Sequence, residues 1–521
     1  MFSFKGTRVF TRSGQFATTK ILRLNQGEDA WVSSAIEGKR PPWRSYRTRS
    51  TAAVHLDGPY TGPRMRTTVP GPKAKEMLQN MHDIMESRVA VGCINFEKSQ
   101  GNYVVDADDN IMLDLFGQIS TLPLGYNHPA VVKAATKQEN LLYLINRPAT
   151  PFQPPVNFAE MIRASLLQCA PPGMHQVTTM GCGTCANENA IKCAFISYQD
   201  RKRGLQFPEE DSEEFKTALW NKPPGSPDLS VLSFIGGLHG RTIGVLSTTH
   251  SASIHKLDIP AFDWPIAPFP QLIYPLEDHV TENKAEEQRC LQRVEELIEE
   301  FNSRGKYVAA MIVEPIQAAG GDNHASPYFF RRLKQICKEN DMQMIIDEVH
   351  TGMGPTGTMW AHEKWGLDEP PDYVTFGKKM QLGGYFHLEG RRPRHENRIN
   401  NTWMGDPVRM LMLQAIVEEI LSNHWIDNVR KTGDVILAGL KQLQELYPQQ
   451  IHNARGVGTF CAIDGHTVEI RDKLLVELKN NGVMIGGCGK QTIHLRPSLI
   501  FQPHHAEIFL NIFEYVLKVY K

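Results

Sequence analysis

The sequence predicts an α/β protein with two parts, a large domain around a mainly parallel β-sheet and a smaller C-terminal α+β domain. Its 521 residues are too many for one ordinary hydrophobic core. The hydrophobic fraction of 41% is that of a globular protein, which excludes wholesale disorder. Short apolar segments alternate with amphipathic helical segments over most of the chain. Such alternation indicates crossover connections between parallel strands, with helices on both faces of the sheet.

The strands of the large domain are predicted from short apolar runs that end in polar or glycine-rich turns. They are expected at Val177–Met180, Val231–Ile235, Ala309–Val313, Met342–Ile346 and Tyr373–Phe376. Helical segments separate these runs. One segment has a single apolar face among glutamates, which indicates a helix that covers the sheet: Leu291, Val294, Leu297, Ile298 and Phe301.

The two ends of the chain have different patterns. Residues 102–116 predict a β-hairpin with its turn at 108–110. Beyond about residue 404 we expect two amphipathic helices (406–422 and 427–446), short strands near 456–463, 483–485 and 492–495, and a last helix from about His505. We therefore expect an N-terminal arm and hairpin at 57–115, the large domain at 116–403 and the small domain at 404–521.

The formal net charge of −1 conceals a basic N-terminal segment. Residues 1–56 hold ten Lys and Arg against three acids, which leaves 46 basic and 54 acidic residues, a net charge of −8, in the rest. The segment has no acid before Glu28, is rich in hydroxyl residues, and interleaves apolar and basic side chains. This composition predicts a mitochondrial presequence at 1–56 and a location in the mitochondrial matrix. A disordered basic tail is the alternative.

Composition also limits the functional class. The near-neutral charge argues against a general nucleic-acid binder. No run of 18 apolar residues is present, so no membrane-spanning helix is expected. Nine cysteines are too few for a disulfide scaffold and fit a reducing compartment.

Candidate functional residues follow the predicted strands, because open α/β sheets bind ligands at the carboxyl ends of their strands. After the first strand, residues 181–185 read Gly-Cys-Gly-Thr-Cys and lead into a helix. Small residues there let backbone N–H groups approach an anion, and the helix N-terminus adds partial positive charge. Such a turn is weak evidence by itself, since many only form a tight corner. After the second strand, residues 236–242 hold His239 and Arg241.

An acid and a lysine follow two further strands. Asp347 comes directly after Met342–Ile346, and Lys378 and Lys379 follow Tyr373–Phe376, 31 residues further on. A pyridoxal phosphate enzyme needs a lysine for the Schiff base, an acid at the pyridine nitrogen and an anion site for the phosphate. The three strand ends together therefore predict such a site.

The same segments resemble the class III aminotransferases. The resemblance is carried by residues 180–189, 238–242, 312–315, 346–349 and 375–379, and it extends from Gly62 to the C-terminus. It implies fold type I of the pyridoxal phosphate-dependent transferases and a homodimer with shared active sites. It also implies a ping-pong transfer of the amino group of 4-aminobutyrate, or of a similar ω-amino acid such as β-alanine, to 2-oxoglutarate.

The resemblance assigns a role to each candidate residue. Lys378 would form the Schiff base and move the substrate's proton, whereas the adjacent Lys379 would point to the other side. Arg241 would hold the substrate carboxylate, and Thr402 would reach the phosphate of the neighbouring subunit. The other expected cofactor contacts are Gly183, Thr184, His239, Asp347 and His350.

Cys182 and Cys185 form a C-x-x-C pair. In mammalian members of the family, the matching pairs of two subunits hold an iron–sulfur cluster. The resemblance therefore implies a [2Fe–2S] cluster bound by four thiolates at the dimer interface. Two unliganded thiols, or a zinc ion, are the alternatives.

Four positions depart from the pattern of the most similar family members. Ala319 replaces a glutamate and His494 replaces its partner arginine, which binds the second substrate's α-carboxylate; Arg496 is kept two residues on. His350 replaces a glutamine beside the cofactor's phenolic oxygen, and Leu238 replaces the aromatic residue stacked on its ring. His494 could still bind a carboxylate if protonated. Two alternatives follow: an aminotransferase with another amine or keto acid, or a catalytically impaired dimeric homologue.

Overall fold

The computed structural model describes residues 56–520. The predicted presequence at 1–56 lies outside the described residues, apart from Leu56 at its end.

A seven-stranded mixed sheet forms the centre of the large part, in the order β3-β9-β8-β7-β6-β4-β5. The strands β4 to β8 run parallel, whereas β9 pairs antiparallel with both β8 and β3. The five predicted strands are confirmed to within two residues. Sequence reasoning missed β5, which has only two residues, and β9, which begins with two glycines. The bounds are β3 Gln176–Met180, β4 Leu229–Phe234, β5 Ile266–Ala267, β6 Tyr307–Val313, β7 Gln343–Asp347, β8 Tyr373–Phe376 and β9 Gly383–His387.

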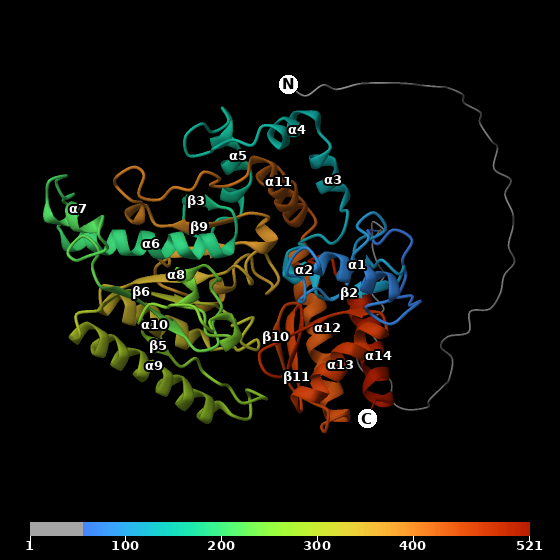
Figure 1. Ribbon diagram of the computed structural model, residues 1–521. Helices are drawn as coiled ribbons and strands as arrows, with labels where there is room; N and C mark the ends of the chain where they lie inside the picture. The colour runs from blue at the N-terminus through green and yellow to red at the C-terminus, as the bar shows by residue number, and fades with distance from the viewer. Residues whose placement is uncertain (1–55, 521) are drawn as a thin grey trace, which may run out of the picture. The chain divides into compact units, whose positions relative to one another are not determined.

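Helices cover both faces of this sheet (Figure 1). The helix α6 (Gly183–Lys202) packs on one face, where Ala310 and Ile312 of β6 point. The helices α9 (Val280–Ser303) and α10 (Pro327–Glu339) pack on the other face against Met311 and Val313. Alternate residues of one strand thus enter two separate cores, as expected for a sheet buried on both sides. The predicted apolar face of 291–301 is confirmed as the buried side of α9.

Shorter helices connect these layers or lie at their edges. Their bounds are α1 Pro72–His82, α2 Gly117–Ser120, α3 Pro129–Ala135, α4 Gln138–Ile145, α5 Phe158–Ala164, α7 Glu213–Ala218 and α8 Ile243–Leu246.

A four-stranded antiparallel sheet, β10-β11-β14-β13, forms the C-terminal part together with helices. The single strand expected at 456–463 is wrong: the chain turns at Gly458 (φ +58°) and forms the hairpin β10–β11. A Cβ there would lie 2.5 Å from the carbonyl oxygen of Pro355, so only glycine fits this close approach. The bounds are β10 Ile451–Val457, β11 Phe460–Gly465, β12 Val483–Met484, β13 Gly486–Cys488, β14 Thr492–Leu495, α11 Pro407–Ser422, α12 Trp425–Leu446, α13 Val468–Asn480 and α14 Pro503–Val519.

The predicted N-terminal hairpin is confirmed as β1 (Tyr103–Val105) and β2 (Ile111–Asp114). It joins a strand from the far end of the chain, since β12 pairs in parallel with β2. The N-terminal hairpin therefore packs with the C-terminal segment. It also leads directly into α2, which contacts the proposed active-site lysines described below.

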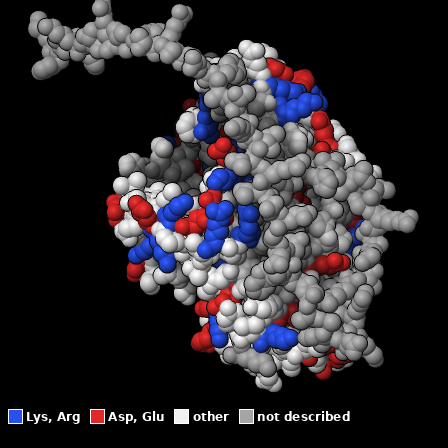
Figure 2. Space-filling view, turned by 90° about the vertical axis from the view of Figure 1, so that its right-hand side faces the viewer, with Lys and Arg blue, Asp and Glu red and all other residues white. Residues whose placement is uncertain are grey.

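No described helix combines the length and the apolar character needed to cross a lipid bilayer. Acidic and basic side chains are interspersed on the described part of the face in Figure 2.

Candidate active site

A buried carboxylate at the end of β7 is the centre of the candidate site. Asp347 is 3% exposed. Its Oδ2 accepts hydrogen bonds from Asn187 Nδ2 (2.8 Å) and from His239 Nδ1 (2.8 Å). Its Oδ1 accepts one from the backbone N–H of Val349 (3.0 Å). These donors come from α6, from the loop after β4 and from the loop after β7, so the fold fixes the position of the carboxylate.

Both candidate lysines follow β8, and the structure separates their environments. Lys378 Nζ donates to the carbonyl of Ile119 (3.0 Å), while Lys379 Nζ donates to the carbonyl (3.0 Å) and the hydroxyl of Ser120. Burial, then Arg496, lowers the pKa of Lys378 to about 8, against the opposing effect of the nearby Asp347 and Glu314 carboxylates. Burial, then Arg496, lowers the pKa of Lys379 well below its usual value. Lys378 follows β8, whose Thr375 lies opposite Asp347 in the parallel pair of β7 and β8.

A left-handed turn in α2 supplies the acceptors for the two lysines. The φ angles of Gln118, Ile119 and Ser120 are +53°, +58° and +66°, values that residues other than glycine rarely adopt. Such consecutive left-handed residues carry backbone strain that the surrounding structure has to hold in place. The turn directs two successive carbonyls at the lysines. Apart from Gly117, no residue pattern predicts it.

Glycines make room for an anion at the N-terminus of α6. A Cβ on Gly183 would lie 2.6 Å from Val349 Cγ1, and one on Gly240 would lie 2.9 Å from Thr184 Oγ1. Gly240 also has a φ of +146°. No side chain caps the first turn of α6. Its free N–H groups, the helix dipole and the Thr184 hydroxyl form a site suited to a phosphate group.

Glu314, directly after β6, is a second buried carboxylic acid. It is 3% exposed and accepts hydrogen bonds from the backbone N–H groups of Leu238 (2.8 Å) and Ala318 (3.2 Å). Burial, then the nearby Asp347 charge, raises its pKa well above the usual value. Glu314 therefore joins the loops after β4 and β6, and it holds Leu238, which was expected to lie beside the cofactor ring.

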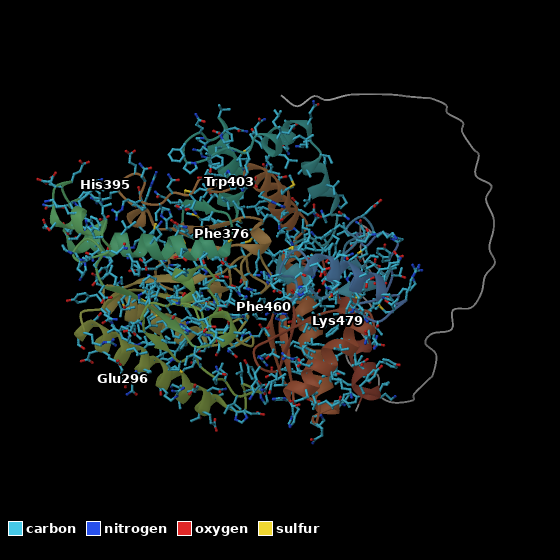
Figure 3. All side chains as sticks on the ribbon, in the orientation of Figure 1. Glu296, Phe376, His395, Trp403, Phe460 and Lys479 are labelled. Atoms are coloured by element: carbon cyan, nitrogen blue, oxygen red, sulfur yellow. The ribbon has the colours of Figure 1, made fainter. Side chains whose placement is uncertain are left out.

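The C-terminal part contributes a group of cations and imidazoles. Arg496 pairs with the buried Asp322 and stacks over Phe460, with the guanidinium 3.3 Å from the ring centroid. Figure 3 shows Phe376, at the end of β8, and Phe460 in the middle of the molecule, with Glu296 on its periphery. Burial, then Arg496, lowers the pKa of His494 well below the usual value. Burial, then Lys378, does the same to the pKa of His350. Both rings are therefore neutral near pH 7, which argues against carboxylate binding by a protonated His494.

Arg241 and Thr402 are not brought into this buried group. Arg241 is exposed and donates to His255 Nε2 (3.0 Å). Thr402 is exposed in the segment after β9 and makes none of the contacts described above. Cys182 and Cys185 lie at the start of α6 with their sulfurs 3.6 Å apart; Cys182 is exposed and Cys185 partly buried.

Sequence reasoning missed Asn187 and Glu314. Asn187 holds both Asp347 and the carbonyl of His239 (2.7 Å). A signal was present: Asn187 begins the stripe Asn187, Ala190, Ile191, Ala194, whose helical spacing places a polar side chain on a buried face. Glu314 is similarly marked by its place directly after an all-apolar strand.

Comparisons with known proteins identify the family of this chain. The family described as aminotransferase class-III matches residues 84–517. The chain belongs to this family. This class III aminotransferase is 50% identical over 481 residues to "4-aminobutyrate aminotransferase, mitochondrial" of Sus scrofa, covering 92% of this chain and 96% of the relative. It is 48% identical over 480 residues to the protein of that name in Homo sapiens, with the same coverages.

A relative from outside the animals and two solved structures are also similar to this chain. The class III aminotransferase is 47% identical over 469 residues to "4-aminobutyrate aminotransferase" of Dictyostelium discoideum, covering 90% of this chain and 94% of the relative. Lysine aminotransferase from M. tuberculosis, solved in its internal aldimine form, has a TM-score of 0.75 at 26% identity, covering 86% of this chain and 99% of that one. The ornithine aminotransferase of Toxoplasma gondii ME49 shares the fold, with a TM-score of 0.67, 18% identity and coverages of 86% and 95%.

Proposed function

We propose that this transaminase transfers the amino group of 4-aminobutyrate, or of a similar ω-amino acid such as β-alanine, to 2-oxoglutarate, with pyridoxal 5′-phosphate as its cofactor. The observation that carries the proposal is the buried Asp347 carboxylate, which Asn187 and His239 hold at the end of β7, next to the strand end that carries Lys378. The names of the relatives support the choice of substrate.

The described residues fit the cofactor. Its phosphate suits the N-terminus of α6, where Gly183 and Gly240 leave room and Thr184 offers a hydroxyl. Asp347 can pair with a protonated pyridine nitrogen, and His350, with its buried Nδ1 lacking a partner among the described residues, can face a polar substituent of the ring. When bound, pyridoxal 5′-phosphate supplies an aldehyde that condenses with amines and a ring that accepts electrons from the substrate carbon.

The residues of this chain perform the proton and charge steps. A pKa of about 8 gives Lys378 an appreciable neutral fraction at physiological pH, so its Nζ can attack a carbonyl or accept a proton from the substrate carbon. Asp347 is held in one orientation because its oxygens accept three hydrogen bonds. Arg241 can bind the substrate carboxylate once it leaves His255.

Half-reaction assays test the proposal. The holoenzyme is mixed with 4-aminobutyrate, β-alanine and a panel of other ω-amines, and the cofactor absorbance is followed. We expect 4-aminobutyrate to convert the cofactor to its amine form and 2-oxoglutarate to restore it. Conversion only by another amine or keto acid would indicate a different substrate. The altered clamp residues Ala319 and His494 would then account for the difference. Binding of cofactor without conversion by any amine would indicate an impaired homologue.

We also propose a homodimer in which Thr402 completes the site of the neighbouring subunit. Its exposure at the surface of one subunit supports this role. A mixed dimer of Lys378→Ala and Thr402→Ala subunits then regains one complete site, so random mixing should restore roughly a quarter of the wild-type activity. No recovery would place Thr402 in the site of its own subunit, or outside any site.

The cluster and the location complete the proposal. The adjacent thiols of Cys182 and Cys185 support a [2Fe–2S] cluster shared between two subunits. Iron and sulfide should co-purify with the wild-type protein and be lost in Cys182→Ser.

The basic, acid-poor segment 1–56 supports import into the mitochondrial matrix. A fusion of residues 1–56 to a fluorescent protein should enter mitochondria, whereas diffuse fluorescence would contradict the location.

A further inference from the structure

Three side chains of metal-ligand type meet where the C-terminal sheet contacts the loop after β6. Asp322, Cys488 and His494 offer a carboxylate oxygen, a thiol sulfur and an imidazole nitrogen, all within 4.8 Å of one another. They come from three separate segments: the 319–322 loop, β13 and β14. His494 is also part of the altered substrate clamp, and the nearby Lys378 charge helps to lower its pKa, so the group lies beside the candidate active site.

The fold brings these side chains together by strand register and glycine contacts. In the antiparallel pair β13–β14, Gly486 lies opposite His494 and Cys488 opposite Thr492, so Cys488 and His494 project from the same face. A Cβ on Gly486 would lie 2.8 Å from His494 Nε2, so glycine makes room for the ring. The backbone N–H of Gly489 donates to the carbonyl of Ala319 (2.9 Å), which fixes the 319–322 loop against this hairpin.

Polar atoms of this group are buried without partners among the described residues. Neither ring nitrogen of His494 makes a hydrogen bond, and Oδ2 of Asp322 also lacks one. The Asp322 side chain is 1% exposed. A buried unpaired polar atom costs about 1–3 kcal/mol, and native proteins keep few of them. Cys488 is a free thiol. The unpaired atoms of His494 and Asp322, next to the Cys488 thiol, indicate a common partner.

Of the nearby arginines, Arg455 and Arg471 have carboxylates of their own, whereas Arg496 shares Asp322 with this group. Arg496 pairs with Asp322, Arg455 with Asp464 (2.8 Å) and Arg471 with Asp472 (2.6 Å). Arg496 occupies only Oδ1 of Asp322, which leaves Oδ2 available. An outer arginine that holds one oxygen of a carboxylate ligand also fixes the orientation of the other oxygen.

We infer that Asp322, Cys488 and His494 form a binding site for one Zn²⁺ ion. A thiolate, an imidazole and a carboxylate are the zinc ligand types, and three protein ligands leave the fourth tetrahedral position for water or an anion. Zinc–ligand distances of about 2.0–2.3 Å place ligand atoms about 3.3–3.6 Å apart. The three atoms, which lie within 4.8 Å of one another, therefore have to approach by at most about 1.5 Å.

The test measures zinc in the holoenzyme. The pair Cys182 and Cys185 could also bind metal, so the parent protein is Cys182→Ser/Cys185→Ser. After dialysis against a weak chelator, mass spectrometry of the metals should find one Zn²⁺ per chain in this parent. Adding Cys488→Ser or His494→Gln should abolish it. The control Cys93→Ser changes a partly buried cysteine outside the group and should leave the zinc content unchanged.

Cobalt substitution gives a second measurement. Co²⁺ bound through Cys488 should show a thiolate charge-transfer band and the strong visible bands of a tetrahedral ion, and Cys488→Ser should lose the charge-transfer band. A parent that binds no Zn²⁺ or Co²⁺, or whose metal survives Cys488→Ser, overturns the inference. Neither outcome depends on transamination, so the result is independent of the proposed function.

Discussion

Asn187 is predicted to be essential for positioning the buried carboxylate. Its side-chain amide donates to Asp347 Oδ2 (2.8 Å) and to the carbonyl of His239 (2.7 Å), and the residue is 1% exposed. Asn187→Ala removes both hydrogen bonds and leaves both acceptors buried. A bond to a charged group contributes about 1.5–3 kcal/mol and one between neutral groups about 0.5–1.5 kcal/mol, so we expect a loss of about 2–4 kcal/mol in stability.

The effect on catalysis should exceed the effect on substrate binding. Asp347 would keep only two of its three donors, and its carboxylate could rotate away from the cofactor ring. A transition-state loss of 1.4 kcal/mol corresponds to a tenfold change in rate. We expect kcat to fall about tenfold or more. KM for the amine should stay nearly unchanged, because Asn187 contacts neither Arg241 nor His494, the two residues proposed to bind substrate carboxylates.

The matched control is Asn189→Ala, two residues along the same helix. Asn189 is also buried, but its amide donates only to the carbonyl of Cys185 within α6 (2.8 Å). Steady-state kinetics and denaturant unfolding of both variants give the comparison. If Asn187→Ala matches Asn189→Ala in kcat and in unfolding midpoint, the positioning role of Asn187 is refuted.

Three further predictions concern the lysine, the anion site and the altered substrate clamp. With the pKa of Lys378 lowered to about 8 by burial, its neutral fraction rises about tenfold per pH unit below 8 and levels off above it. The rate of cofactor attachment to the apoprotein, followed by absorbance, should likewise rise about tenfold per pH unit below pH 8 and level off above it. A rate that still rises at pH 10 would contradict the lowered pKa of Lys378. Gly240→Ala should weaken cofactor binding at least tenfold by equilibrium titration, because its Cβ would meet Thr184. Gly204→Ala, which also has a positive φ but open space around it, is the control, and equal affinities would refute the steric argument. Ala319→Glu with His494→Arg should raise kcat/KM for 2-oxoglutarate, and an unchanged or lower value would mean that these replacements do not set acceptor preference.

The positions of the functional residues after the strands were predictable, because a parallel sheet brings the carboxyl ends of its strands to one edge. Five apolar runs located β3, β4, β6, β7 and β8, and the polar residues after them, including Asp347 and Lys378, were expected to meet at one edge of the sheet. The relation between the two lysines was only partly predictable: alternation separates them, but the acceptors come from α2, more than 250 residues away in the chain.

What the sequence did not reveal depends on backbone geometry and long-range packing. The turn at Gly458 is set by the close approach of Pro355, which no local pattern encodes. The left-handed residues 118–120 contradict ordinary backbone preference, and such strain is held only by tertiary contacts. The departure at His494 was visible in the sequence, but its proximity to Cys488 and Asp322 required the strand register.

The most direct test of the proposed site is chemical labelling of the lysine. Borohydride reduction of the holoenzyme fixes the cofactor on the amine to which it is attached, and peptide mass mapping identifies that residue. We predict that the label lies on Lys378, because Lys379 is buried with its amine bonded to Ser120. A label on Lys379, or no labelled lysine, would contradict the proposed active site.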